Sequence, residues 1–106
     1  MYPMWISYKL REDKADDPIN KYSDRYKNLM AALKVMSPDF SWSEPSSFHV
    51  INSKFGIETC LEVLKKAINP QIDIVVLGVF YEHPIYIIGH NENDSIYKLI
   101  SCIKYS

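Results

Sequence analysis

The chain has 106 residues, of which 47% are hydrophobic and 24% are charged, and its formal net charge is −1. This length and balance are typical of one folded globular domain and exclude a globally disordered chain. A nearly neutral chain also lacks the overall basicity of many nucleic-acid-binding proteins, so such binding would need a local patch. We therefore expect a single domain over residues 1–106.

The apolar segments are short. The longest, from Ile72 to Tyr81, is interrupted by Asp73 and falls well below the ~20 residues of a membrane-spanning helix. The beginning of the sequence has no basic region followed by a long apolar run, as a signal peptide would. We expect a soluble cytoplasmic protein with no membrane partner.

The first predicted strand, Met4 to Leu10, contains Trp, Ile and Tyr, which favour a pleated, half-buried surface. A polar loop over 11–22 follows, and Ser23 is expected to cap a helix that ends at Ser37-Pro38. Its apolar stripe has spacings of three and four and comprises Tyr26, Leu29, Met30, Leu33 and Met36. The residues expected to face solvent are Arg25, Lys27, Asn28 and Lys34.

In the middle of the chain, the residue pattern predicts two short strands, a helix and a buried strand. The strands cover 40–44 and 47–52, around Pro45. The helix runs from about Gly56 to Ile68, and its stripe comprises Ile57, Cys60, Leu61, Leu64 and Ile68. The β-branched run DIVVLGVFY at 73–81 is typical of a central strand that is buried on both faces.

The last quarter of the chain adds one strand and one helix. The strand is IYIIG at 85–89, and Asn93 or Asp94 is expected to cap a helix with a stripe of Ile96, Leu99, Ile100 and Ile103. The order is a βαββαβ core with an additional C-terminal strand and helix. Two helices on one face of a mostly antiparallel sheet would bury every stripe in one core. The sequence therefore predicts an α+β, ferredoxin-like fold.

Most motifs that carry catalysis are missing from the sequence. Its three glycines are scattered, so there is no phosphate-binding loop, and no serine has the G-x-S-x-G spacing. The histidines, His49, His83 and His90, do not have the spacing of metal ligands. Cys60 and Cys102 form no CxxC motif and are expected to be small buried thiols, although two cysteines alone leave a disulfide open. We expect no catalytic residue, no metal site and no cofactor.

Basic residues gather at the end of the first strand. Lys9 and Arg11 precede an acidic cluster, and Lys14 lies within it. A phosphate site would use Lys9 and Arg11, and we add Lys14 and Ser47 to the predicted nucleic-acid-binding residues. The alternative is a solvated polar loop, because the basic residues alternate with Glu12, Asp13, Asp16 and Asp17.

Aromatic residues are plentiful on the predicted strands, where we place Tyr8, Trp42, Phe48, Phe80 and Tyr86. On an exposed sheet face such rings can stack on nucleobases. The alternative is that they cover the core or a dimer interface. The aromatic-glycine motif of RNA-recognition domains is absent from the third strand.

The succession of these elements resembles Cas2-like small proteins, especially the branch called SinR-like. The segments that carry the resemblance are WISYKLRE, YKNLMAALK, SWSEPSSFHVI, FGIETCLEVL, DIVVLGVF and DSIYKLI. The resemblance implies a ferredoxin-like homodimer linked to CRISPR adaptation or to toxin-like roles. Several such proteins are metal-dependent nucleases, whose first strand ends in an acidic residue, as in SYD, so that two carboxylates across the dimer hold a divalent metal.

This chain has SYK, with Lys9 at the matching position. Because an ammonium group cannot ligate Mg²⁺, we expect a noncatalytic homodimer that binds nucleic acid or a nucleotide near Lys9 and Arg11. Two alternatives stay open. One is a protein-interaction module or inhibitor of a larger complex, with its partner surface after Pro84. The other is an Mg²⁺-dependent endonuclease in which acidic residues of the loop at 12–17 replace the missing ligand.

Overall fold

The computed structural model describes residues 1–12 and 21–106. Its elements in chain order are β1 (Tyr2–Lys9), α1 (Tyr22–Met36), β2 (Ser41–Trp42), β3 (Phe48–Ser53), α2 (Ile57–Ala67), β4 (Ile74–Val79), β5 (Ile85–Gly89), α3 (Ile96–Leu99) and β6 (Ile103–Tyr105). Within these described residues, the fold is α+β, with a six-stranded mixed sheet and three helices.

The strands lie in the order β2-β3-β1-β4-β5-β6. Every neighbouring pair is antiparallel except β5 and β6, which are parallel. The longest strand, β1, therefore lies between β3 and β4, and each of its residues has a partner on at least one side. Its end at Lys9 is held opposite Ile74 of β4.

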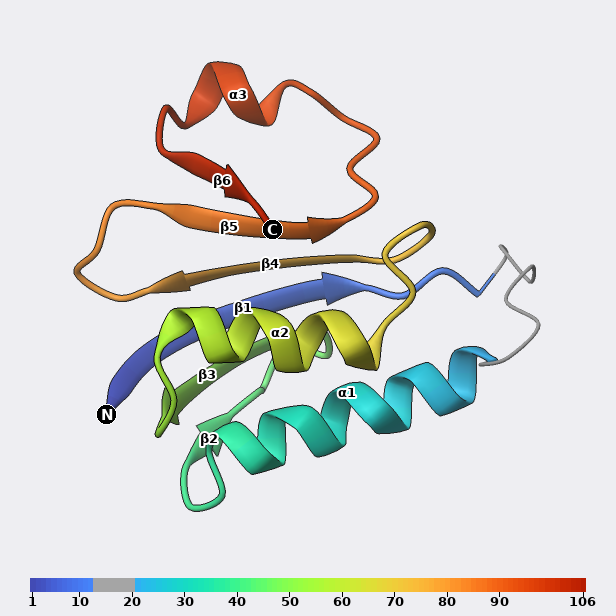
Figure 1. The fold of residues 1–106 in the computed structure, drawn as a ribbon, viewed down its shortest axis with the longest axis vertical. Coiled ribbons are helices and arrows are strands. Elements are labelled where there is room, and N and C mark those ends of the chain that lie inside the picture. Colours follow the sequence, from blue (N-terminus) through green and yellow to red (C-terminus); the bar gives the residue numbers. More distant parts are fainter. Residues whose placement is uncertain (13–20) are drawn as a thin grey trace.

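Helices α1 and α2 cover the same face of the sheet (Figure 1). Their stripes contribute Leu29, Leu33, Cys60 and Leu64 to one core, which the sheet completes with residues such as Ile6. Because side chains alternate along a strand, Trp5, Ser7 and Lys9 of β1 lie on the opposite face. The short helix α3 packs on that opposite face near β4 and β5, where Ile96 and Leu99 line a cavity. Among the described residues, the opposite face over β2, β3 and β1 has no helix; we call this area the uncovered face.

Two expectations for α1 are wrong. The cap is Lys21 rather than Ser23, and the Asp24 carboxylate accepts a hydrogen bond from the Lys21 backbone N–H at 3.4 Å. Arg25, which was expected to face solvent, is buried, whereas Tyr26 of the predicted apolar stripe is exposed. The reason is a buried carboxylate that draws the Arg25 side chain inwards, as described below.

The predicted C-terminal helix is also wrong beyond its first turn. The chain forms α3 for only four residues and then β6. Ile103 and Tyr105 favour a pleated strand, and the free edge of β5 gives them a partner: the Ile85 N–H donates to the Cys102 carbonyl at 2.9 Å. Cys102 is consequently exposed, contrary to expectation, while Cys60 is buried as expected, and both thiols are free.

No helix among the described residues is both long and apolar enough to cross a membrane.

Candidate functional site

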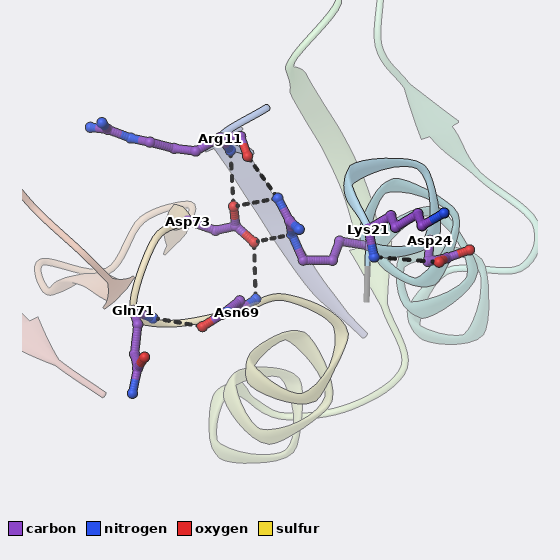
Figure 2. A network of polar contacts seen from close by, with 7 residues as sticks. Arg11, Lys21, Asp24, Asn69, Gln71 and Asp73 are labelled. Carbon is purple, nitrogen blue, oxygen red and sulfur yellow. Dashed lines mark hydrogen bonds and ion pairs between the residues drawn. The ribbon is translucent and has the colours of Figure 1, made fainter. Parts of the chain in front are cut away.

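A buried carboxylate fixes the end of β1. Asp73 is fully buried, and its Oδ1 accepts a hydrogen bond from the Arg11 backbone N–H at 2.9 Å. Its Oδ2 accepts from Arg25 Nε and from the Asn69 backbone N–H, both at 2.9 Å. Figure 2 shows this carboxylate between segments that are distant in the sequence. The contacts hold the residues after β1, the first turn of α1 and the end of α2 around one buried group.

Lys9 and Ser47, two of the predicted binding residues, are brought together by this framework. They line an open cavity of about 450 Å³ at the end of β1, which we call the strand-end cavity. The described residues that line it are Tyr8, Lys9, Leu10, Tyr22, Tyr26, Ser46 and Ser47. The Tyr8 N–H donates to the Ser47 carbonyl at 3.2 Å, so backbone pairing places Ser47 beside the strand end.

Three tyrosines form the aromatic part of the strand-end cavity. The Tyr22 and Tyr26 rings are stacked, with centroids 6.4 Å apart, and both rings are partly exposed. The Tyr8 hydroxyl donates to the Ser46 carbonyl at 3.2 Å. Partial burial, with the neighbouring Tyr26 hydroxyl, raises the pKa of Tyr8 to about 12. A tyrosine hydroxyl is protonated at neutral pH even at its ordinary pKa, so Tyr8 adds no negative charge to the cavity.

The other two predicted binding residues are not placed in this cavity. The Arg11 side chain extends away from Asp73 (Figure 2), and its Nη2 lies 2.6 Å from a carboxylate oxygen of Glu92. Its charge is thus paired beyond the end of β5, on the far side of the strand end from Ser47. Lys14 lies outside the described residues.

The uncovered face carries a row of aromatic side chains, Trp5, Phe48 and Trp42, which we call the aromatic row. The Trp5 and Phe48 rings are stacked at 6.4 Å, and Trp42 meets Phe48 edge-on at 6.5 Å. The sequence placed Trp42 and Phe48 among candidate stacking residues but did not single out Trp5. Two other candidates, Tyr8 and Tyr86, pack against the helix-side core instead, and Phe80 is exposed beyond the end of β4.

No group of three His, Cys, Asp or Glu side chains suited to a metal ion is found over residues 1–12 and 21–106. Most of the acidic loop, 13–20, lies outside the described part of the chain, so the nuclease alternative remains a hypothesis. Of the histidines, His49 is nearly buried in the sheet and stacks on Tyr8 at 5.7 Å, as expected for a side chain that fills a sheet face.

Comparison with known proteins gives no family to which the chain can be assigned: no family model, no curated protein and no solved structure matches it. The likeness to Cas2-like proteins is therefore a hypothesis that rests on the sequence alone.

Sequence reasoning missed two parts of this region. Arg25 and Asp73 were not recognised as partners. A signal was present in Asp73, which begins a β-branched strand that was expected to be buried, because a buried aspartate usually has a paired cation. Of the tyrosines of α1, Tyr26 was assigned to the core stripe and Tyr22 was left unassigned. Helical spacing alone does not show which end of an apolar stripe extends beyond the sheet.

Proposed function

We propose that the protein is a noncatalytic nucleic-acid-binding domain that holds a phosphate and an adjacent base in the strand-end cavity. The observation that carries the proposal is the lining of that cavity, to which Lys9, Ser47, Tyr22 and Tyr26 all contribute. A cation and a hydroxyl suit a phosphate, and aromatic faces suit a base.

The charges of the cavity favour an anion. Lys9 is exposed, and Tyr8, like an ordinary tyrosine, is neutral at physiological pH. None of the described residues that line the cavity is an aspartate or glutamate. Among the described residues, a phosphate at this cavity would lie near a lysine and several hydroxyl-bearing residues.

We also propose a ferredoxin-like, Cas2-like architecture that forms a homodimer. The antiparallel order β2-β3-β1-β4, with α1 after β1 and α2 after β3 on one face, supports the ferredoxin-like assignment. In this reading β5, α3 and β6 are additions at one edge. The homodimer and the Cas2-like relationship rest on the resemblance of the sequence segments.

Fluorescence anisotropy with labelled single-stranded RNA and DNA tests the binding proposal. Lys9→Ala should weaken binding and reduce the slope of log K against log [salt] by about 0.7 for each lost phosphate contact. Ser47→Ala should weaken binding less, because a neutral hydroxyl contributes less than an ammonium group.

Lys66→Ala is the matched control, because Lys66 is an exposed lysine on α2, away from the cavity. It should leave the affinity within twofold of wild type. Absence of binding at low salt, or equal losses from Lys9→Ala and Lys66→Ala, would refute the proposal. Cleavage of the oligonucleotides with Mg²⁺ or Mn²⁺ would instead favour the nuclease alternative.

A further inference from the structure

A cavity of about 270 Å³ lies between α3 and the sheet, and we call it the α3 cavity. Its apolar lining consists of Ile74 and Val76 of β4, Ile87 of β5, and Ile96 and Leu99 of α3. Because side chains alternate along a strand, the three strand residues share the face of the sheet that α1 and α2 do not cover. The cavity is therefore separate from the main core.

The helix α3 spans this cavity without closing it. None of its four residues is buried, and Leu99 is 78% exposed. Contacts on both sides of the helix fix its position: Asn91 Nδ2 donates to the Tyr105 hydroxyl at 3.1 Å, and the Ile85 N–H donates to the Cys102 carbonyl at 2.9 Å. The apolar walls are thus held apart, and a wall that faces an unfilled space lacks van der Waals partners.

The remaining lining of the α3 cavity is polar and uncharged, and consists of Asn91, Asn93 and Ser95. Two successive turns order these residues. Asn91 Oδ1 accepts from the Asn93 N–H at 3.2 Å, and Asn93 Oδ1 accepts from the Ser95 N–H at 3.0 Å. Asn93 and Ser95 are exposed, and these turns leave the Asn93 NH₂ and the Ser95 hydroxyl to other partners. The cavity therefore has an accessible edge that can donate and accept hydrogen bonds.

Charge and volume define the class of molecule that fits. No charged residue is among the described residues that line the α3 cavity. Lys9 is the register partner of Ile74 but does not line it, and Glu92 is paired with Arg11 at 2.6 Å. An ion on these apolar walls would lose water without gaining a partner. A dry apolar cavity of about 150 Å³ admits benzene, so one of about 270 Å³ has room for a bicyclic molecule.

We infer that the α3 cavity binds a small uncharged molecule with a bicyclic apolar body and one hydrogen-bonding group. The body lies between α3 and the sheet, and the polar group lies at the edge formed by Asn93 and Ser95. Apolar walls with a few polar groups that fix orientation are typical of small-molecule sites. The inference does not depend on the proposed function, because no described residue lines both this cavity and the strand-end cavity.

Indole is the probe, because it has two fused rings and one N–H donor. Methyl NMR of isoleucine-labelled protein should show saturable shifts of Ile74, Ile87 and Ile96 during titration, whereas Ile6 of the helix-side core should not shift. Indene, which has nearly the same shape but no N–H, should bind several-fold more weakly. Indole-3-carboxylate should bind more weakly than indole, because its charge has no partner in the lining.

Val76→Phe fills the cavity from the sheet and should weaken indole binding about tenfold or more. Val35→Phe is the matched control, because Val35 is an exposed valine on α1, and it should leave the affinity unchanged. Leu99→Trp is the second cavity variant. It narrows the cavity from an exposed position, so it should preserve the fold even where Val76→Phe strains the sheet. Circular dichroism and thermal melting verify the fold of each variant.

Saturable shifts confined to the three cavity isoleucines and lost in both cavity variants support the inference. Absence of saturable shifts up to the solubility limit of indole would overturn it, as would unchanged affinity in folded Val76→Phe and Leu99→Trp. Tighter binding of the carboxylate than of indole would show that the assignment of an uncharged ligand is wrong. Shifts of Ile96 on dilution without indole, with a matching change in light scattering, would show that a second copy of the chain covers the cavity instead.

Discussion

His49 is a nearly buried histidine on the helix-side face of β3, stacked on Tyr8. Its Nε2 atom is buried and has no hydrogen-bond partner within the described part of the chain. Burial lowers the pKa of His49 below its ordinary value of 6.5, because the charged imidazolium loses water without gaining a partner. The ring is therefore held neutral in the folded protein at neutral pH.

This lowered pKa predicts a pH-dependent stability. Above pH 6.5 the imidazole is neutral in both states; below pH 6.5 the unfolded chain binds a proton that the folded chain does not. The free energy of unfolding should fall as the pH drops from 6.5 to the pKa of the folded state. Urea unfolding of wild type and His49→Phe across pH 5–8 measures this, and the difference between the two proteins should change in that window. A constant difference would contradict the prediction.

At the residue scale, Lys9 shows that the strand pattern of a segment and the chemistry of one of its side chains are separate predictions. The strand that carries it forms as the sequence predicts, and Lys9 is among the residues that line the strand-end cavity. The resemblance would place a metal-binding carboxylate at this position, where this chain has an ammonium group. The same backbone site is therefore suited to an anion instead of a cation.

At the scale of elements, the pairing of the end of β5 with the start of β4 depends on one glycine. Gly89 has φ +98°, and a Cβ at this position would lie 2.1 Å from the Asp73 carbonyl oxygen. That carbonyl accepts a hydrogen bond from the His90 N–H at 2.8 Å, so the two backbones are held close together. The end of β5 can approach the start of β4 only because Gly89 has no side chain.

Gly89→Ala should consequently destabilise the protein by about 3 kcal/mol or more, since it combines a strained backbone with a steric clash. Gly56→Ala is the matched control: this glycine caps α2 with φ −68°, and an added Cβ would meet no atom closer than 4.0 Å. It should cost less than about 1 kcal/mol. Chemical denaturation compares them, and similar midpoints for the two variants would show that the close approach is not required.

At the scale of the whole molecule, the buried pair of Arg25 and Asp73 connects the first and second halves of the chain. Both side chains are nearly inaccessible, and Arg25 Nη2 also donates to the Arg11 carbonyl at 2.8 Å. The pair thereby links the end of β1, the start of α1 and the segment before β4, on either side of residues 13–20. It holds the framework of the strand-end cavity.

Asp73→Asn should lower the free energy of unfolding by about 3–5 kcal/mol, because it leaves the Arg25 guanidinium buried without its charged partner. The double variant with Asp73→Asn and Arg25→Met should cost less than the sum of the two single changes, since it removes both members of the buried pair. Urea denaturation of the four proteins of this cycle measures the coupling. Additive losses would show that the two residues stabilise the fold independently.

Much of the fold followed from local pattern. The spacing of apolar residues located α1 and α2, and β-branched residues located β4 and β5, because these patterns reflect one buried face or strand. Local pattern did not predict the structure of the C-terminal segment. Its isoleucines fit a helix stripe as well as a strand, and the edge of β5, which is remote in the sequence until the sheet forms, decided between them.

The candidate sites divide in the same way. Lys9 and Ser47 were predicted from residue type, but that they line one cavity with Tyr22 and Tyr26 depends on the pairing of β1 with β3 and the placement of α1. The aromatic row likewise needs three strands in register before Trp5 meets Phe48.

The sequence by itself determined which segments become helices and strands over most of the chain, and that the first strand ends in a lysine. The tertiary structure alone decided that Arg25 pairs with the buried Asp73 and that Arg11 pairs with Glu92 instead of lining a site with Lys9. It also decided that the rings of Trp5, Phe48 and Trp42 lie on one face. The physical reason is that periodicity reports only whether a residue is apolar along its own element. Pairing of charges and contact of rings arise between elements, from register and packing that bring distant residues together.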